Sequence, residues 1–189
     1  GYTDPTLAAL VCNASGSTPA FEVVYEGNKD NTVMTGGKPS ACLRTSLSGT
    51  GPYFVRNRYY FSATTSTRPA LYCASTVSSG QPLIENIQNM KIWYGVTNVT
   101  PPAAGSTQVV RYVTQTDIAA LGAAAAAVEW SRVIAVRMCL LVRSAEPVLN
   151  TGEDSMTYLD CDNSPQTTRD RYLRRAYFTT ATLRARMPT

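Results

Sequence analysis

The sequence predicts an α+β fold that is mostly β, with six or seven antiparallel strands and one or two short helices. Apolar and polar residues alternate in several separate segments, most clearly at 133–143, and such alternation is typical of strands with one buried face. Start and stop signals for a helix occur in only one short segment, at 116–122. The 189 residues contain no linker and no internal repeat, so we expect a single domain, 1–189.

The first expected strand is FEVVYE, at 21–26. Its odd-numbered residues are apolar and both of its glutamates lie on the opposite face, which predicts one solvated side. A polar loop is expected from 27 to about 40. Segments 53–62 and 70–75 are β-prone and are separated by turn-forming residues, so we expect them to form a hairpin.

The segment LIENIQNMKIWYGV, at 83–96, changes its periodicity partway along. Ile84, Ile87 and Met90 have helical spacing, whereas the residues from Met90 onward alternate as in a half-buried strand. We therefore expect a turn at 78–82, then a single helical turn that leads into a strand.

A short strand at 108–113 and a short helix are expected next. Thr116 and Asp117 provide an N-cap and an acidic first turn, and Gly122 provides a stop. The alanine run 123–127 either extends this helix or forms a loop, and the sequence leaves both possibilities open.

The clearest strand is 133–143. Its even-numbered residues are apolar and are expected to pack inward, with Cys139 and two arginines on the outward face. A polar, acidic stretch at 150–170 is expected to loop away before a final strand at 177–183.

Five cysteines are spread along the chain without a C-x-x-C pair, which argues against a zinc ribbon or a thioredoxin-like site and favours disulfides. Cys139 and Cys161 are the favoured pair, because a loop that carries Cys161 can fold over the outward face of the strand. Closing such a loop contributes roughly 3 kcal/mol. Cys42 with Cys73 is the second pair, with Cys12 to Cys42 as an open alternative, and reduced buried cysteines remain a third possibility.

The chain contains no histidine, which removes the usual general base at neutral pH and the commonest transition-metal ligand. No nucleophile or nucleotide-binding motif is present, and the acidic stretch at 153–170 lacks the spacing of an EF-hand. We therefore expect no enzyme activity, no catalytic or cofactor-binding residues, no metal site and no cofactor.

Positive charge is concentrated near the C-terminal end. A possible polyanion contact consists of Arg171, Arg174, Arg175, Arg184 and Arg186. The first three could equally pair with the acidic stretch just upstream, and the last two lie where alternate residues of a strand face water. Nucleic acid is therefore not an expected partner.

Three ordered segments carry a resemblance to a known family. They are LIENIQNMKIWYGV, VIAVRMCLLVRSAEP (133–147) and RRAYFTTATLRARM (174–187), with the segment 111–113 as further support. Together they resemble the PilW-type minor pilins of type IV pili and, more distantly, the J-type pseudopilins of type II secretion. Gly1 and Tyr2 look like the end of the long N-terminal helix of that family.

The resemblance implies a pilin-like globular head whose long N-terminal helix is missing from this chain. It implies a structural subunit of a Gram-negative bacterium that is anchored in the inner membrane with a periplasmic head and later lies outside the cell in the pilus, with a link to twitching motility. The implied partners are other minor pilins and the major pilin, with no small-molecule substrate. The missing helix would shelter an apolar face of the sheet. The alternative is a secreted or surface receptor-binding adhesin domain, with DNA contact through the C-terminal arginines as an additional possibility.

Overall fold

The computed structural model describes residues 19–62, 69–101, 107–148 and 155–183. These residues form twelve strands and two helices, which confirms an α+β fold that is mostly β. The strand count exceeds six or seven because several short strands form inside segments that were expected to be loops. The chain divides into two compact units, 1–88 and 89–189, which are described separately. The single domain stays a prediction.

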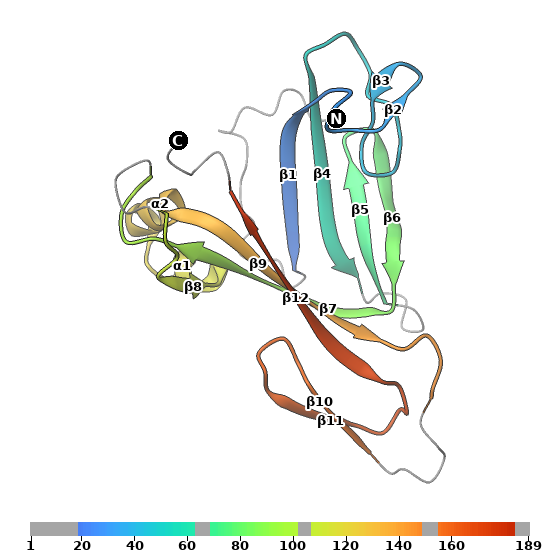
Figure 1. Ribbon diagram of the computed structural model, residues 1–189, viewed down its shortest axis with the longest axis vertical. Coiled ribbons are helices and arrows are strands. Elements are labelled where there is room, and N and C mark those ends of the chain that lie inside the picture. The colour runs from blue at the N-terminus through green and yellow to red at the C-terminus, as the bar shows by residue number, and fades with distance from the viewer. Residues whose placement is uncertain (1–18, 63–68, 102–106, 149–154, 184–189) are drawn as a thin grey trace. The chain divides into compact units, whose positions relative to one another are not determined.

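The first unit contains a four-stranded antiparallel sheet with the order β1-β4-β5-β6 (Figure 1). Its strands are β1 (Ala20–Gly27), β4 (Tyr53–Ser62), β5 (Ala70–Ser75) and β6 (Ser78–Glu85). Within the loop between β1 and β4, β2 (Met34–Thr35) and β3 (Lys38–Pro39) form a second, two-stranded ladder. The hairpin of β4 and β5 has the predicted bounds.

The two faces of β1 differ as its alternation predicts, although neither is fully solvated. Phe21 pairs with Tyr59 across the ladder, and the two rings stack with their centroids 5.0 Å apart. On the opposite face, Glu22 forms an ion pair with Arg56, and its side chain is only 22% exposed. A charged residue on a sheet surface is thus shielded by a partner on the neighbouring strand.

The turn expected at 78–82 and the helical turn after it were wrong. β6 runs through this turn cluster, and Asn86, with a φ of 65°, separates it from the long strand β7 (Ile87–Val96). Asparagine adopts this left-handed conformation more readily than most residues. Ile87 and Met90 lie on opposite faces of β7 and are both buried. Their three-residue spacing therefore reflects a strand whose first part is covered on both faces, and not a helical turn.

The second unit contains a four-stranded sheet with the order β12-β9-β7-β8, and a separate hairpin. The further elements of this unit are β8 (Arg111–Val113), α1 (Gln115–Ala119), α2 (Ala123–Ser131), β9 (Val133–Arg143), β10 (Met156–Leu159), β11 (Pro165–Thr168) and β12 (Arg174–Thr182). β9 has the predicted bounds. β8 is shorter than expected, and β12 begins three residues before the expected start.

The N-cap of α1 is Thr114, so the expectation that Thr116 caps the helix was wrong. The Thr114 hydroxyl accepts a hydrogen bond from the backbone N–H of Asp117, and the Asp117 carboxylate accepts one from the backbone N–H of Thr114. This reciprocal capping box satisfies two N–H groups that a helix start otherwise leaves unpaired. Gly122, with a φ of 82°, ends this turn, and the alanine run then forms α2.

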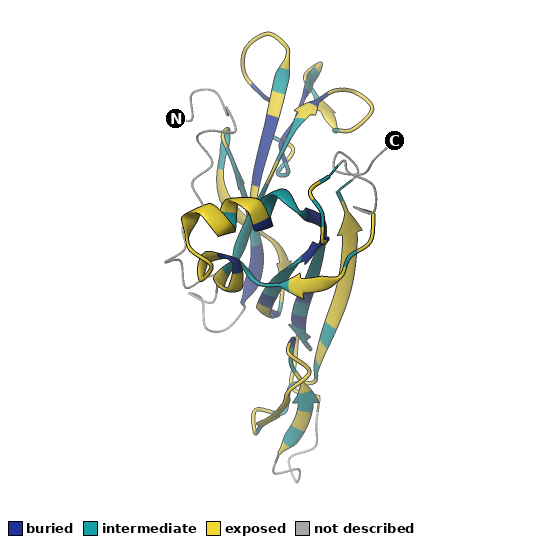
Figure 2. Cartoon of the chain, turned by 90° about the vertical axis from the view of Figure 1, so that its left-hand side faces the viewer, coloured by how far each residue is buried: buried dark blue, intermediate teal, exposed yellow. Residues whose placement is uncertain are grey.

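Cys139 lies on the face of β9 that was expected to point outward, but this face is covered, and the Cys139 side chain is fully buried. It lies in a cluster with Leu141 and Cys161, against which Trp93 and Tyr158 pack. The reason is that the acidic stretch expected to loop away contains the β10–β11 hairpin, which covers this face of β9. Figure 2 shows the contrast between the buried strands and the exposed strand that leads to the C-terminal end.

Candidate functional site

The structure joins Cys139 of β9 to Cys161 in the turn between β10 and β11. Their Cα atoms are 5.7 Å apart, and 22 positions separate the two residues along the chain. Asp160 shapes this turn, because its carboxylate accepts hydrogen bonds from the backbone N–H groups of Asp162 and Ser164. These bonds, led by the one from Ser164, lower the pKa of Asp160. The turn therefore presents Cys161 in a fixed position.

Two further contacts hold the same hairpin. Lys91 of β7 forms an ion pair with Asp162, and the Arg174 guanidinium lies over the Tyr158 ring, 5.4 Å from its centroid. A two-stranded hairpin is marginal by itself in water. The disulfide and these contacts together attach it to the sheet.

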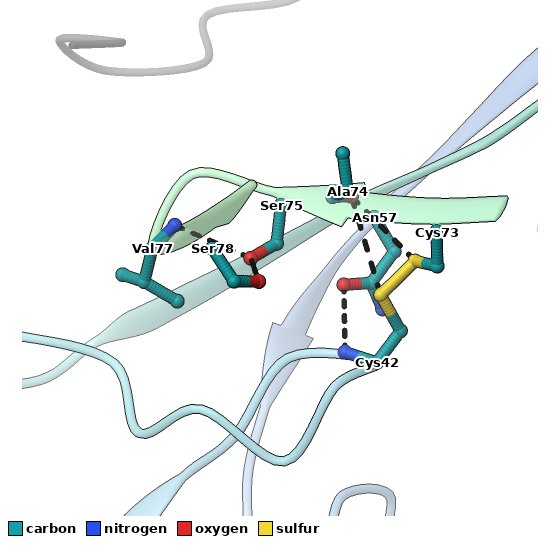
Figure 3. The surroundings of a disulfide bond; sticks show 7 residues. All are labelled: Cys42, Asn57, Cys73, Ala74, Ser75, Val77 and Ser78. Carbon is teal, nitrogen blue, oxygen red and sulfur yellow. Dashed lines mark hydrogen bonds between the residues drawn. A yellow bond between two sulfur atoms is a disulfide. The ribbon is translucent and has the colours of Figure 1, made fainter. Parts of the chain in front are cut away.

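A second disulfide joins Cys42 to Cys73 of β5, with the Cα atoms 6.6 Å apart (Figure 3). The backbone N–H of Cys42 donates to the Asn57 side-chain oxygen at 3.0 Å, and Asn57 is only 3% exposed. The loop around Cys42 also buries Ala41. This disulfide thus fastens the long loop between β1 and β4 to its own sheet. Cys12 lies outside the described residues, so the structure does not place the alternative partner of Cys42.

Arg174 is committed to a structural ion pair. It bonds Asp170 through two nitrogens, donates from Nη1 to the Tyr172 carbonyl at 3.0 Å, and its side chain is 4% exposed. The hydrogen bond from Arg174 is the main cause that lowers the pKa of Asp170 from 3.8 to about 2. Of the two interpretations of the sequence, contact with a polyanion or pairing with the acidic stretch, Arg174 follows the second.

Two other arginines of the proposed polyanion contact, Arg175 and Arg171, are among the described residues. Arg175, the next residue of β12, is exposed on the opposite face of the strand and lies over the Tyr177 ring, 5.5 Å from its centroid. Arg171 adopts a φ of 62°, and its carbonyl accepts from Val148 at 3.1 Å. Arg184 and Arg186 lie outside the described residues.

Sequence reasoning missed an arginine that lies among aromatic rings, which we call the arginine–aromatic cluster. The Arg137 guanidinium is 4.9 Å from the Phe178 ring centroid, 5.8 Å from Tyr112 and 5.9 Å from Trp93. Phe178 and Tyr112 are also among the exposed large apolar residues. Alternation places Arg137 on one face of its strand, but no signal in the sequence reveals which strands flank it.

The opposite face of this sheet contains an apolar strip that is only half-buried. Its members are Ile92, Val136, Met138, Leu140 and Val142. At the β8 edge of the same face, Trp130 of α2 packs edge-on against Tyr94 with the ring centroids 4.6 Å apart, and Arg111 of β8 pairs with the buried Glu129. We call the remaining strip the half-buried apolar face.

No described segment offers a metal site or a membrane-spanning helix. Among residues 19–62, 69–101, 107–148 and 155–183, no group of three or more Cys, Asp or Glu side chains could hold a metal ion. In the same residues, neither helix is long and apolar enough to cross a bilayer.

Comparison with known proteins identifies a matching family. The family model for PilW, described as type IV pilus-assembly protein W, matches residues 58–185, more than half of the chain. The match extends from within β4 to beyond the end of β12. No curated protein and no solved structure matches the chain.

Proposed function

The chain belongs to the PilW family of type IV pilus-assembly proteins, and on this basis we propose that it is a structural minor pilin. In this proposal it helps to prime pilus assembly as part of a minor-pilin complex, at the tip of the filament. Its partners are other minor pilins and the major pilin, and its task is binding rather than catalysis.

The half-buried apolar face is the observation that supports this proposal best. Five apolar side chains of β7 and β9 are buried only in part, and leaving apolar area in water forgoes roughly 25 cal/mol for each Å². An apolar helix encoded ahead of Gly1 would cover such a strip, as helices cover the open face of a sheet in two-layer folds. We propose that this helix anchors the subunit in the inner membrane and later packs into the filament core.

The two disulfides support a location in which thiols are oxidised. A periplasmic head before assembly and an extracellular head in the pilus both meet this condition. The alternative function, an adhesin domain that contacts DNA, draws less support. Arg174, one of the five arginines of the proposed polyanion contact, is already paired with Asp170.

The proposal is tested by replacing Leu140, on the half-buried apolar face, with glutamine in the full-length gene. The matched control is Leu121→Gln, because Leu121 is 50% exposed in the turn between α1 and α2. Both variants are expressed in cells that lack the natural copy, and surface pili are counted by electron microscopy. We expect Leu140→Gln to reduce piliation severalfold and Leu121→Gln to leave it unchanged.

Thermal unfolding of the purified heads separates a docking defect from misfolding. The Leu140→Gln head is expected to keep a cooperative transition, with its Tm lowered by a few degrees. Normal piliation with this variant, or an open reading frame without an apolar helix ahead of Gly1, would count against a pilin.

A further inference from the structure

We propose that the outer edge of β12 is a strand-addition site for an acidic, extended segment of a neighbouring subunit. This inference rests on the proposed function, since it names how one partner would be held. Strand addition uses backbone hydrogen bonds for affinity and alternate side chains for specificity.

The other outer strands of the two four-stranded sheets, β1, β6 and β8, carry features that discourage pairing with a further strand. β8 has only three residues, β6 contains Pro82 and pairs with β5 through two register shifts, and β1 carries Glu22 and Glu26. Short length, proline, bulges and charge are the devices by which natural sheets protect their edges.

β12 lacks these devices over most of its length. Its nine residues, RRAYFTTAT, pair with β9 in one continuous register, without a shift, and contain no proline, glycine or lysine. Every residue from Tyr177 to Thr182 is exposed, and in the described part of the chain no strand pairs with the outer side of β12. A long, regular and exposed edge of this kind is a template for another strand.

The charge around this edge indicates which strand it accepts. Arg175 is exposed on one face of β12, and Arg137 reaches Phe178 on the other face. Neither arginine forms an ion pair with a carboxylate in the described part of the chain.

Five of the six acidic side chains that the structure describes in the second unit are engaged elsewhere. Asp117 forms the capping box, and Asp160 accepts hydrogen bonds in the turn at Cys161. The other three form ion pairs: Glu129 with Arg111, Asp162 with Lys91 and Asp170 with Arg174. A strand added beside β12 would therefore meet, on each face, one guanidinium that has no carboxylate partner among the described residues. Opposite charges on neighbouring strands are favourable. Two adjacent acidic residues in the partner strand would point to opposite faces, so that one would pair with Arg175 and the other with Arg137.

Synthetic peptides can test this edge on the purified chain. The probe is a nine-residue peptide of alternating threonine and valine with two adjacent glutamates at its centre, and its counterpart has lysines in place of the glutamates. Binding is measured by calorimetry, and the site is located by the slowing of amide hydrogen exchange. We expect the acidic peptide to bind and to protect the amides of β12, whereas the basic peptide does not bind.

Backbone pairing is separated from simple charge attraction by N-methylation. An added strand pairs along one edge only, so methylation of one alternating set of peptide amides should weaken binding about tenfold or more, and methylation of the other set should not. Equal binding by both methylated peptides, protection outside β12, or no binding at millimolar concentration would each overturn the proposal.

Arg175→Glu tests the charge, and Arg169→Glu is its matched control, because Arg169 is exposed in the segment between β11 and β12. Arg175→Glu should weaken the acidic peptide about tenfold and allow the basic peptide to bind, while Arg169→Glu changes neither by more than about twofold. Concentration-dependent protection of β12 without peptide would identify a second copy as the occupant and refute an acidic partner. The minor-pilin role itself depends on piliation and survives a negative peptide result.

Discussion

Asp170 and Arg174 form an ion pair at the start of β12 in which the arginine side chain is 4% exposed and the aspartate 43% exposed. The same guanidinium packs over Tyr158 of the β10–β11 hairpin. The pair thus connects the first residue of β12 to the segment before it and to the hairpin.

Replacing Asp170 with asparagine should make stability less sensitive to acid. Because the pKa of Asp170 falls from 3.8 to about 2 on folding, its stabilisation is complete above about pH 4 and is lost as the pH falls towards 2. The carboxylate is partly exposed, so we expect a contribution of less than about 1 kcal/mol. Urea unfolding at pH 6, 4, 3 and 2 measures it. A variant whose loss of stability is the same at every pH would contradict the ion-pair explanation.

Removing the Cys139–Cys161 disulfide by replacing both residues with serine should lower the free energy of unfolding by about 3 kcal/mol, because the crosslink closes a loop of about 22 residues in the unfolded chain. Amide exchange should increase first in β10 and β11. The double Cys42→Ser, Cys73→Ser variant is the control and should affect the loop between β1 and β4 instead.

Mass spectrometry of unreduced peptides checks the two pairs directly. We expect Cys139 linked to Cys161 and Cys42 linked to Cys73, with Cys12 as the remaining thiol. A peptide that links Cys12 to Cys42 would instead support the alternative pairing.

Gly27→Ala should destabilise the first unit. An added Cβ would lie 2.5 Å from Cγ2 of the fully buried Val55 and 3.2 Å from Cβ of Pro39. Overpacking of this kind costs about 1–3 kcal/mol. Gly36→Ala is an unsuitable control because Gly36 has a φ of 59°. The control is Ala124→Gly on the exposed surface of α2, because this substitution creates no steric clash. Thermal unfolding should show a larger loss for Gly27→Ala.

Thr114→Ala should remove the hydroxyl acceptor of the α1 capping box and lower stability by about 1 kcal/mol. Thr116→Ala, inside the same helix, is the matched control and should have a smaller effect. Chemical denaturation of the two variants compares them. An equal loss of stability in the two variants would instead support Thr116 as the N-cap of this helix.

Duplex DNA should bind weakly and only at low salt. Arg174 is buried in its ion pair, so Arg174→Ala should reduce stability more than it reduces DNA binding. Arg175→Ala should reduce binding without a loss of stability. Fluorescence anisotropy between 50 mM and 200 mM salt makes the comparison. Tight binding that falls steeply with salt would favour DNA contact through the arginines, whereas binding that persists at the higher concentration would count against it.

Segments whose own composition or alternation favours a strand were predicted well, because these signals depend on local geometry. The bounds of β4, β5 and β9 agree with the sequence. The failures lie where distant residues decide the outcome. β7 starts with burial on both faces, and its apparent helical spacing follows from that packing.

The surroundings of Cys139 show the same division. Alternation identified its face correctly, but whether that face is covered depends on a hairpin made of two four-residue strands. Strands this short carry almost no periodicity. The arginine–aromatic cluster was missed for a related reason, because it needs the order of β8, β7, β9 and β12 in the sheet.

The crosslink at Cys161 makes the finished shape of the second unit depend on redox conditions. A chain whose cysteines are reduced lacks the covalent tie between β9 and the β10–β11 hairpin. Trp93 and Leu141 would then be covered by a hairpin that keeps its apolar, ionic and ring contacts but lacks the crosslink. We therefore expect oxidation to complete the attachment of this hairpin, and a reductant should release it while the ladder between β9 and β12 persists.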